Sequence, residues 1–88
     1  METLKTGSLA YFDTFAGIIP CKVLKIERLT DAIPKNYVAS SSTLATIKLT
    51  ATRGAYKRGE ILQEWSLHVI PRKAVKGNRI KSYRVQVD

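Results

Sequence analysis

The side chains best suited to chemistry in this chain are cations, and they occur in two clusters. The first cluster consists of Arg53, Lys57 and Arg58. The second is longer, contains no acidic residue, and consists of Arg72, Lys73, Lys76, Arg79, Lys81 and Arg84. Phosphate groups bind such side chains through charge and counterion release, and arginine adds forked hydrogen bonding. The two clusters therefore predict a nucleic-acid-binding surface.

The overall charge points the same way. The chain carries fifteen Lys and Arg against seven Asp and Glu, which gives a net charge of +8 and an isoelectric point near 9.9. A domain this basic attracts polyanions, so we expect nucleic acid or an acidic protein surface as its partner. The alternative is a well-solvated surface without a specific partner. No apolar run approaches the length of a membrane span, so we expect no membrane partner.

Each basic cluster contains a tyrosine, and exposed aromatic rings beside cations can stack on unpaired bases. Tyr56 lies in an expected turn of the first cluster and is the better stacking candidate. Tyr83 lies in the second cluster but alternates with Val85 and Val87, so we favour a place for it in the core.

Candidates for catalysis are few. His68 is the only histidine, and Ser66 lies two residues away on the polar face of an expected strand. A Ser–His–acid site also needs an orienting carboxylate, so we favour a surface histidine on a sheet. Glu60 and Glu64 would lie about 13 Å apart along a strand, farther than paired catalytic carboxylates. Glu60 is better interpreted as a charge partner of the cations just before it.

Motifs for cofactors are also missing from the sequence. Residues 53–60 contain two glycines but lack the Gly-Lys-Ser/Thr ending of a phosphate-binding loop. One cysteine, Cys21, and one histidine cannot form the usual Cys/His zinc site within one chain. We therefore predict a non-catalytic protein without cofactor or metal. The single cysteine excludes an internal disulfide, which favours the reducing cytoplasm as its location.

Two strands with a turn between them are expected to carry the first cluster. Residues 43–53 and 61–70 alternate between apolar and polar side chains, as half-buried antiparallel strands do. In the first, the expected inward residues are Ala45, Ile47, Leu49 and Ala51. In the second, a buried face is expected from Ile61, Trp65, Leu67 and Val69. The second strand would then separate the two basic clusters by its own length.

Three further stretches have strand character. Residues 7–12 form a short strand, with either Leu9 and Tyr11 or Ala10 and Phe12 facing inward. Residues 18–29 form a long strand whose alternation breaks once between Val23 and Leu24, which predicts either a bulge or a strong bend. Residues 80–87 form a last strand.

The spacing of these strands, without a convincing amphipathic helix, predicts one small all-β domain over residues 1–88. It would be a small barrel or a strongly bent sheet. Residues 30–42 contain Pro34 and three consecutive serines and are expected to form a long loop. Residues 1–6 are expected to be a frayed lead-in.

Two stretches resemble parts of SH3-like small barrels. Residues 17–26, Gly-Ile-Ile-Pro-Cys-Lys-Val-Leu-Lys-Ile, are similar to the glycine-led Val-x-x-Ile strand of KOW- and Tudor-type barrels. Residues 67–72, Leu-His-Val-Ile-Pro-Arg, are similar to the last strand of SH3-like folds, where a valine–proline pair precedes a short helical turn. The resemblance implies a barrel of about five antiparallel strands with an extra C-terminal strand, and a binding module rather than an enzyme. The short, basic chain also resembles small bacteriophage proteins.

Three hypotheses for function remain open. The first is a small barrel that binds nucleic acid through residues 53–58 and the second basic cluster. The next is a protein-interaction module, such as a phage-encoded inhibitor or adaptor of a nucleic-acid-handling or defence protein, in which residues 30–42 would also matter. The third is a homo-oligomeric structural component that adds residues 80–87 to a neighbour's sheet edge.

Overall fold

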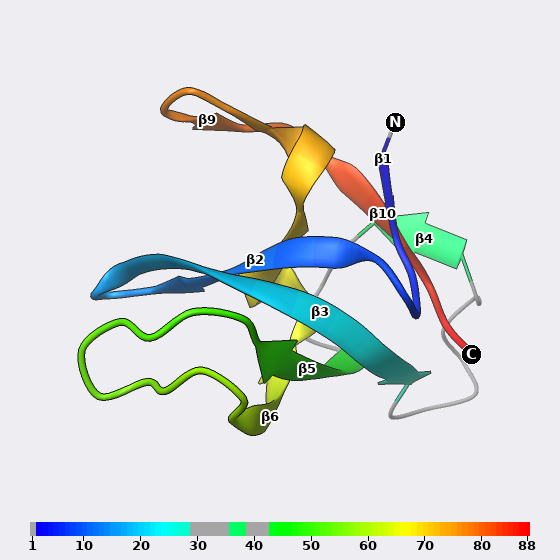
Figure 1. The fold of residues 1–88 in the computed structure, drawn as a ribbon. Helices are drawn as coiled ribbons and strands as arrows, with labels where there is room; N and C mark the ends of the chain where they lie inside the picture. Colours follow the sequence, from blue (N-terminus) through cyan, green and yellow to red (C-terminus); the bar gives the residue numbers. More distant parts are fainter. Residues whose placement is uncertain (1, 29–35, 39–42) are drawn as a thin grey trace.

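The protein is built from β-strands and two short 3₁₀ turns, which confirms the all-β prediction (Figure 1). The structure, a computed structural model, describes residues 2–28, 36–38 and 43–88. In this part of the chain there is no α-helix, and therefore none long and apolar enough to cross a bilayer.

The main element is an antiparallel sheet of five strands. These are β2 (Leu9–Thr14), β3 (Gly17–Arg28), β5 (Thr43–Leu49), β6 (Ile61–Trp65) and β7 (Val69–Pro71). Their order across the sheet is β6-β5-β3-β2-β7, so β6 and β7 are its two edges and the sheet is not closed into a barrel. Strands were predicted from the sequence at all of these places.

The long strand β3 bends at a bulge. Its register with β5 shifts between Val23 and Lys25, and Leu24 between them is exposed while Val23 and Ile26 are buried. The extra residue explains why the apolar alternation breaks there, and it confirms the predicted bulge. The bend lets the sheet curve around its core.

The predicted buried face of β6 is wrong. Ile61 and Trp65 are 59% and 37% exposed, whereas Leu62 and Glu64 face inward opposite Ile47 and Ala45. The register is set by β5, whose Ala45 and Ile47 are fully buried, and side chains opposite each other in a ladder point to the same face. Ile61 and Trp65, the two apolar residues at odd positions of β6, therefore face solvent.

The predicted strand over residues 61–70 is also interrupted. A 3₁₀ turn, η1 (Ser66–His68), follows β6, and the chain then enters β7, which pairs with β2 at the opposite edge of the sheet. Leu67 lies in this turn and is 49% exposed. The two basic clusters therefore do not lie at the two ends of one strand.

A second, smaller sheet closes the far end of the core. Its order is β1 (Glu2–Leu4), β10 (Tyr83–Gln86) and β4 (Asn36–Val38), with β10 parallel to β1 and antiparallel to β4. The expected lead-in thus contains a strand. Because β10 is paired on both sides, it offers no free edge to a neighbouring copy. Of the loop expected at residues 30–42, only β4 lies within the described residues.

Between β7 and β10 the chain forms a 3₁₀ turn and a hairpin. The turn is η2 (Arg72–Ala74), and the hairpin joins β8 (Val75–Lys76) to β9 (Arg79–Ile80). Gly77 has φ of +58°, which suits the tight two-residue connection that it forms with Asn78. The strand expected at residues 80–87 is therefore divided into β9 and β10.

One hydrophobic cluster holds the two sheets together. It contains residues from both ends of the chain, including Leu4, Ile19, Ile47, Val69 and Val85, each fully buried. Tyr83 also belongs to it, as predicted. The hairpins that carry the cations extend from this core.

Candidate nucleic-acid interface

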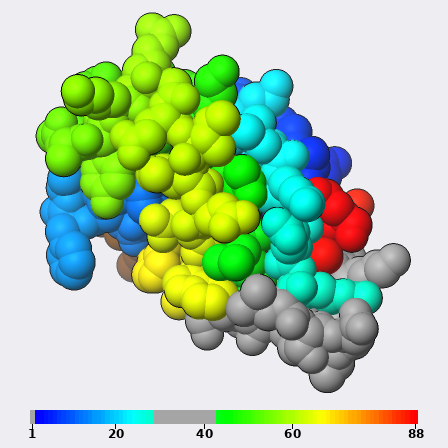
Figure 2. Space-filling model, turned by 90° about the horizontal axis from the view of Figure 1, so that it is seen from below, coloured from blue at the N-terminus to red at the C-terminus, as the bar shows by residue number. Residues whose placement is uncertain are grey.

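The first basic cluster stands on an ordered connection between β5 and β6. Arg53 and Tyr56 exchange two backbone hydrogen bonds of 2.9 Å, which close a tight turn with Gly54 at φ of +57°. The backbone amide of Arg58 donates to Thr52 Oγ1 at 3.0 Å. Figure 2 shows this segment at one end of the face that β6, β5 and β3 cover. The backbone is thus fixed while the side chains of Arg53, Lys57 and Arg58 are exposed.

Glu60 closes the other end of this connection, but not as the expected charge partner. Its Oε1 accepts a hydrogen bond of 3.1 Å from the backbone amide of Lys57. The nearby cationic side chains form no ion pair with a described residue. They therefore keep their charge available to an external anion.

The ring of Tyr56 is less available for stacking on a base than the sequence predicted for a residue in a turn. Its ring meets that of Phe12 edge to face, with centroids 5.5 Å apart and planes at 85°. It is half-buried against the hydrophobic cluster. The Tyr56 ring therefore packs partly against Phe12 and holds the segment between β5 and β6 against β2.

Arg72 has a structural contact within the second cluster. Its guanidinium lies over the ring of Tyr11, 5.3 Å from the centroid, and its Nε donates a long hydrogen bond of 3.5 Å to the carbonyl of Ala10. Both partners belong to β2. This arginine therefore helps dock η2 on the sheet edge.

Only some of the other residues of the second cluster lie around one common surface. Lys73, Lys76 and Lys81 line a shallow hollow of about 550 Å³ together with Arg72, and Glu2 is its acidic member. Arg79 and Arg84 are exposed but line none of the hollows described here. Four of the six predicted residues thus surround one concave surface.

The two basic clusters lie at opposite edges of the sheet. The first follows β5 and precedes β6, while the second follows β7. Figure 1 shows the hairpin of β2 and β3 between them. They do not merge into one compact patch, and a ligand that contacts both must be extended.

Sequence reasoning missed three cations. Lys5 lines a second hollow, of about 540 Å³, which adjoins the first through Arg72 and Lys73. Lys22 and Lys48 are exposed and stand directly opposite each other on β3 and β5. Their alternation with apolar residues marks them as outward-facing, but only the register of the strands shows that they are neighbours.

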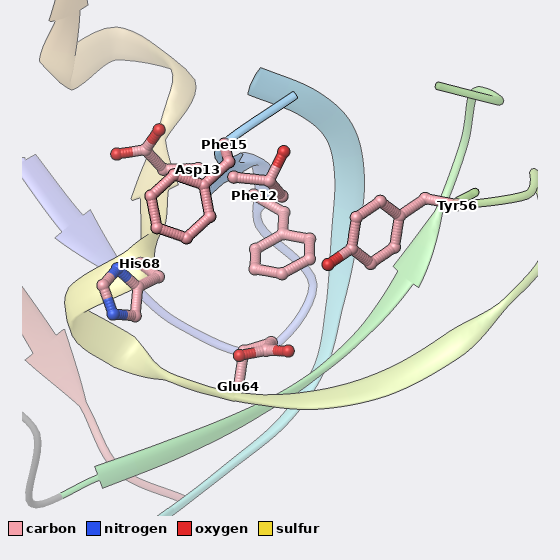
Figure 3. Close-up of a pocket in the computed structure, with 7 residues that line it drawn as sticks. Phe12, Asp13, Phe15, Tyr56, Glu64 and His68 are labelled. Carbon is pink, nitrogen blue, oxygen red and sulfur yellow. The ribbon is translucent and has the colours of Figure 1, made fainter. Parts of the chain in front are cut away.

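A third hollow, of about 400 Å³, has a different character (Figure 3). It lies between the β2–β3 turn, Tyr56 and η1, and its lining consists of Phe12, Asp13, Thr14, Phe15, Tyr56, Glu64 and His68. The predicted shared face of Ser66 and His68 is wrong, because Ser66 is buried beside Thr43 and His68 is exposed. No group of three or more possible metal ligands gathers among the described residues.

Two buried groups have shifted pKa values. Burial raises the pKa of the Cys21 thiol to about 11, an effect that the positive charge of Arg72 partly offsets. Burial also raises the pKa of Tyr83, and the negative charge of Asp13 adds to the rise. Both groups therefore stay protonated and neutral at physiological pH, and neither adds to the charge of the surface.

Comparison of the chain with protein-family models, with curated proteins and with solved structures finds no match.

Proposed function

We propose that this protein is a non-catalytic binding module with an SH3-like outline that contacts nucleic acid through its two basic clusters. The outline is supported by the return of β7 to β2 after η1, and by the 3₁₀ turn that directly follows Ile70 and Pro71. The proposal places the protein in a reducing compartment such as the cytoplasm, because its single thiol is buried and unpaired.

The observation that carries the proposal is the set of uncompensated cations on ordered backbone. The ion pair between described residues joins Lys25 and Glu27, neither of which belongs to a cluster. Charges without an internal partner release counterions when phosphates replace them, which is the main source of affinity in non-specific nucleic-acid binding. The separation of the clusters favours an elongated polyanion over a small phosphate ligand.

A titration of binding against salt concentration tests the proposal. Fluorescence anisotropy with a labelled single-stranded and a double-stranded oligonucleotide should give affinities that fall steeply with salt. Each lost phosphate contact lowers the slope of log affinity against log salt by about 0.7 for single strands and 0.9 for duplexes. We expect R53A/K57A/R58A and K73A/K76A/K81A each to reduce this slope, while Arg72 is left in place because it packs on Tyr11.

The matched control is K25A, which removes a lysine outside both clusters. A loss of slope in K25A about one third as large as in either triple variant would show that only net charge matters. Absence of binding at low salt, or an affinity that does not depend on salt, would overturn the proposal.

The exposed apolar residues favour a second candidate, a protein-interaction module such as a phage-encoded inhibitor or adaptor. Ile61 and Trp65 on the edge strand β6, together with Leu67 in η1, are exposed and close in sequence. Aromatic residues are enriched at the centres of protein interfaces. Given a purified candidate partner, W65S/L67S should then weaken binding, whereas charge reversal at the exposed Lys73 and Lys76 should not.

A further inference from the structure

The third hollow combines features that neither folding nor the basic clusters explain. It opens between the turn that joins β2 to β3, the connection before β6, and η1 (Figure 3). Its volume of about 400 Å³ falls within the ~300–1,000 Å³ typical of small-molecule sites. The lining brings aromatic rings and carboxylates together.

Three aromatic rings form one part of the lining. Phe12 is 4% exposed and forms the floor with Tyr56, whose ring meets it edge-on. Phe15 is fully exposed at the tip of the β2–β3 turn. Its ring stands over the His68 side of the hollow (Figure 3). A ring that packs against nothing in the fold remains free to stack on a planar ligand, and base–aromatic stacking is tolerant of sequence.

Two carboxylates form the other part. Glu64 points into the hollow from the inner face of β6, and Asp13 lies at its rim on β2 (Figure 3). Neither side chain forms a hydrogen bond or an ion pair with a described residue. A carboxylate only accepts hydrogen bonds, and in base recognition it pairs with exocyclic amino groups such as N4 of cytosine.

The hollow is next to the first basic cluster. Tyr56 lines it, is followed directly by Lys57 and Arg58, and is tied to Arg53 by the reciprocal backbone bonds. These cations would repel a basic peptide segment, and the carboxylates would repel a phosphate placed in the hollow itself. A nucleotide is compatible with both groups: its neutral base can enter the hollow beside the carboxylates, and its phosphates can stay outside, near the cations.

We propose that this hollow receives one unpaired base of a single-stranded nucleic acid and prefers bases that carry an exocyclic amino group. The proposal rests on the proposed function and names the ligand class of that same surface. Phe15 supplies the stack, Glu64 accepts a hydrogen bond from the exocyclic amino group, and the cations of the adjoining cluster contact the flanking phosphates.

The test compares oligo(dC) with oligo(dT) of equal length, across a salt series, by fluorescence anisotropy. The unmodified protein should bind oligo(dC) more tightly. F15A should weaken binding to both strands about 5- to 150-fold, the equivalent of losing one stacked base. E64Q should reduce the preference for oligo(dC) while the salt slope stays unchanged, because no phosphate contact is lost.

Two control variants match these changes. I80A removes an apolar side chain that is 51% exposed on β9, outside the hollow, and E27Q neutralises an acid that is paired with Lys25. Both should bind as the unmodified protein does. Thermal unfolding of every variant verifies that the fold is intact.

The outcomes separate this inference from the proposed function. Salt-dependent binding with no preference between the strands, or with F15A equal to I80A, would overturn the hollow as a base site and leave the basic surface standing. Tight binding of an oligo-arginine peptide that E64Q abolishes would also overturn it in favour of a protein ligand. If the unmodified protein binds no oligonucleotide at low salt, both proposals fail.

Discussion

The ring of Phe12 meets the ring of Tyr56 edge to face, with centroids 5.5 Å apart. Phe12 belongs to β2 and Tyr56 to the connection between β5 and β6, two segments that share no backbone ladder. The contact therefore fixes the first basic cluster to the core at a point that the sheet itself does not hold.

Removal of the Tyr56 ring should destabilise the protein more than removal of its hydroxyl. Y56A loses an aromatic pair worth about 0.5–1.5 kcal/mol in addition to its buried area. We expect Y56A to lower the free energy of unfolding by about 1–3 kcal/mol, and Y56F by less than about 0.5 kcal/mol, as measured by urea denaturation. Equal effects of the two variants would show that the ring contact contributes nothing.

A second prediction concerns the buried hydroxyl of Tyr83. This hydroxyl donates a hydrogen bond of 2.6 Å to the carbonyl of Ser66, which links β10 to η1. Y83F removes the donor from a buried acceptor, so we expect a loss of about 1–3 kcal/mol in the free energy of unfolding.

The control for Y83F is Y11F. Tyr11 is half-buried, and its hydroxyl has no hydrogen bond to another described residue. Its loss should cost less than about 0.5 kcal/mol. A Y83F protein as stable as Y11F would contradict the assigned hydrogen bond.

The strands of the main sheet could be predicted because their signal is local. The bulge at Leu24 was likewise visible, because it places Val23 and Ile26 on one face despite their odd spacing. The inward face of β6 could not be predicted from the sequence. Whether Leu62 or its neighbours Ile61 and Gln63 point into the core depends on the register of β6 with β5. One residue of shift exchanges the two faces of a strand.

Long-range pairing limited the prediction of the site in the same way. The pairing of β1 with β10 joins opposite ends of the chain, so nothing local to residues 1–6 indicates that Lys5 lines the same hollow as Lys73. The third hollow also draws on three separate segments. The sequence around Phe15 and around Glu64 does not indicate a binding site, and only the fold brings the two residues together.

Alkaline pH should destabilise the protein through Cys21. Its thiol has a pKa of about 11 in the folded chain, raised from 9.0, so the unfolded chain loses this proton first. The associated stability is complete below pH 9 and is lost as the pH rises toward 11. The raised pKa of Tyr83 acts in the same direction at higher pH.

The size of this effect is accessible from a comparison with C21A. Between pH 8 and pH 10 the unmodified protein should lose about 1 kcal/mol more unfolding free energy than C21A does. C21A keeps every other ionisable group of the chain, so the difference isolates the thiol. Parallel pH profiles would mean that Cys21 is not buried in a site that disfavours its thiolate.

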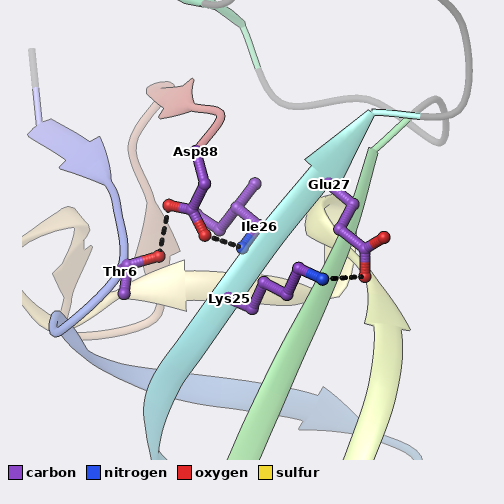
Figure 4. Close-up of polar contacts among 5 residues, drawn as sticks. All are labelled: Thr6, Lys25, Ile26, Glu27 and Asp88. Carbon is purple, nitrogen blue, oxygen red and sulfur yellow. Dashed lines mark hydrogen bonds and ion pairs between the residues drawn. The ribbon is translucent and has the colours of Figure 1, made fainter.

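The last prediction concerns Asp88, whose carboxylate ties three segments together (Figure 4). Oδ1 accepts a hydrogen bond of 2.5 Å from Thr6 Oγ1, and Oδ2 accepts one of 3.0 Å from the backbone amide of Ile26. The amide of Asp88 also donates to the carbonyl of Ile26 at 3.1 Å. These bonds hold the end of the chain against β3, just after its bulge.

Loss of this carboxylate should loosen the second sheet. D88A removes both side-chain bonds but keeps the backbone bond, so we expect a loss of about 1–2 kcal/mol, within the range for hydrogen bonds to charged groups. K25A breaks the nearby ion pair with Glu27 (3.6 Å), whose side chains are 59% and 42% exposed (Figure 4). Such a pair contributes little, so K25A should change stability by less than about 0.5 kcal/mol. Hydrogen exchange would locate the change: faster exchange at the Ile26 amide in D88A, but not in K25A, would identify Asp88 as the anchor, whereas unchanged exchange there would exclude that role.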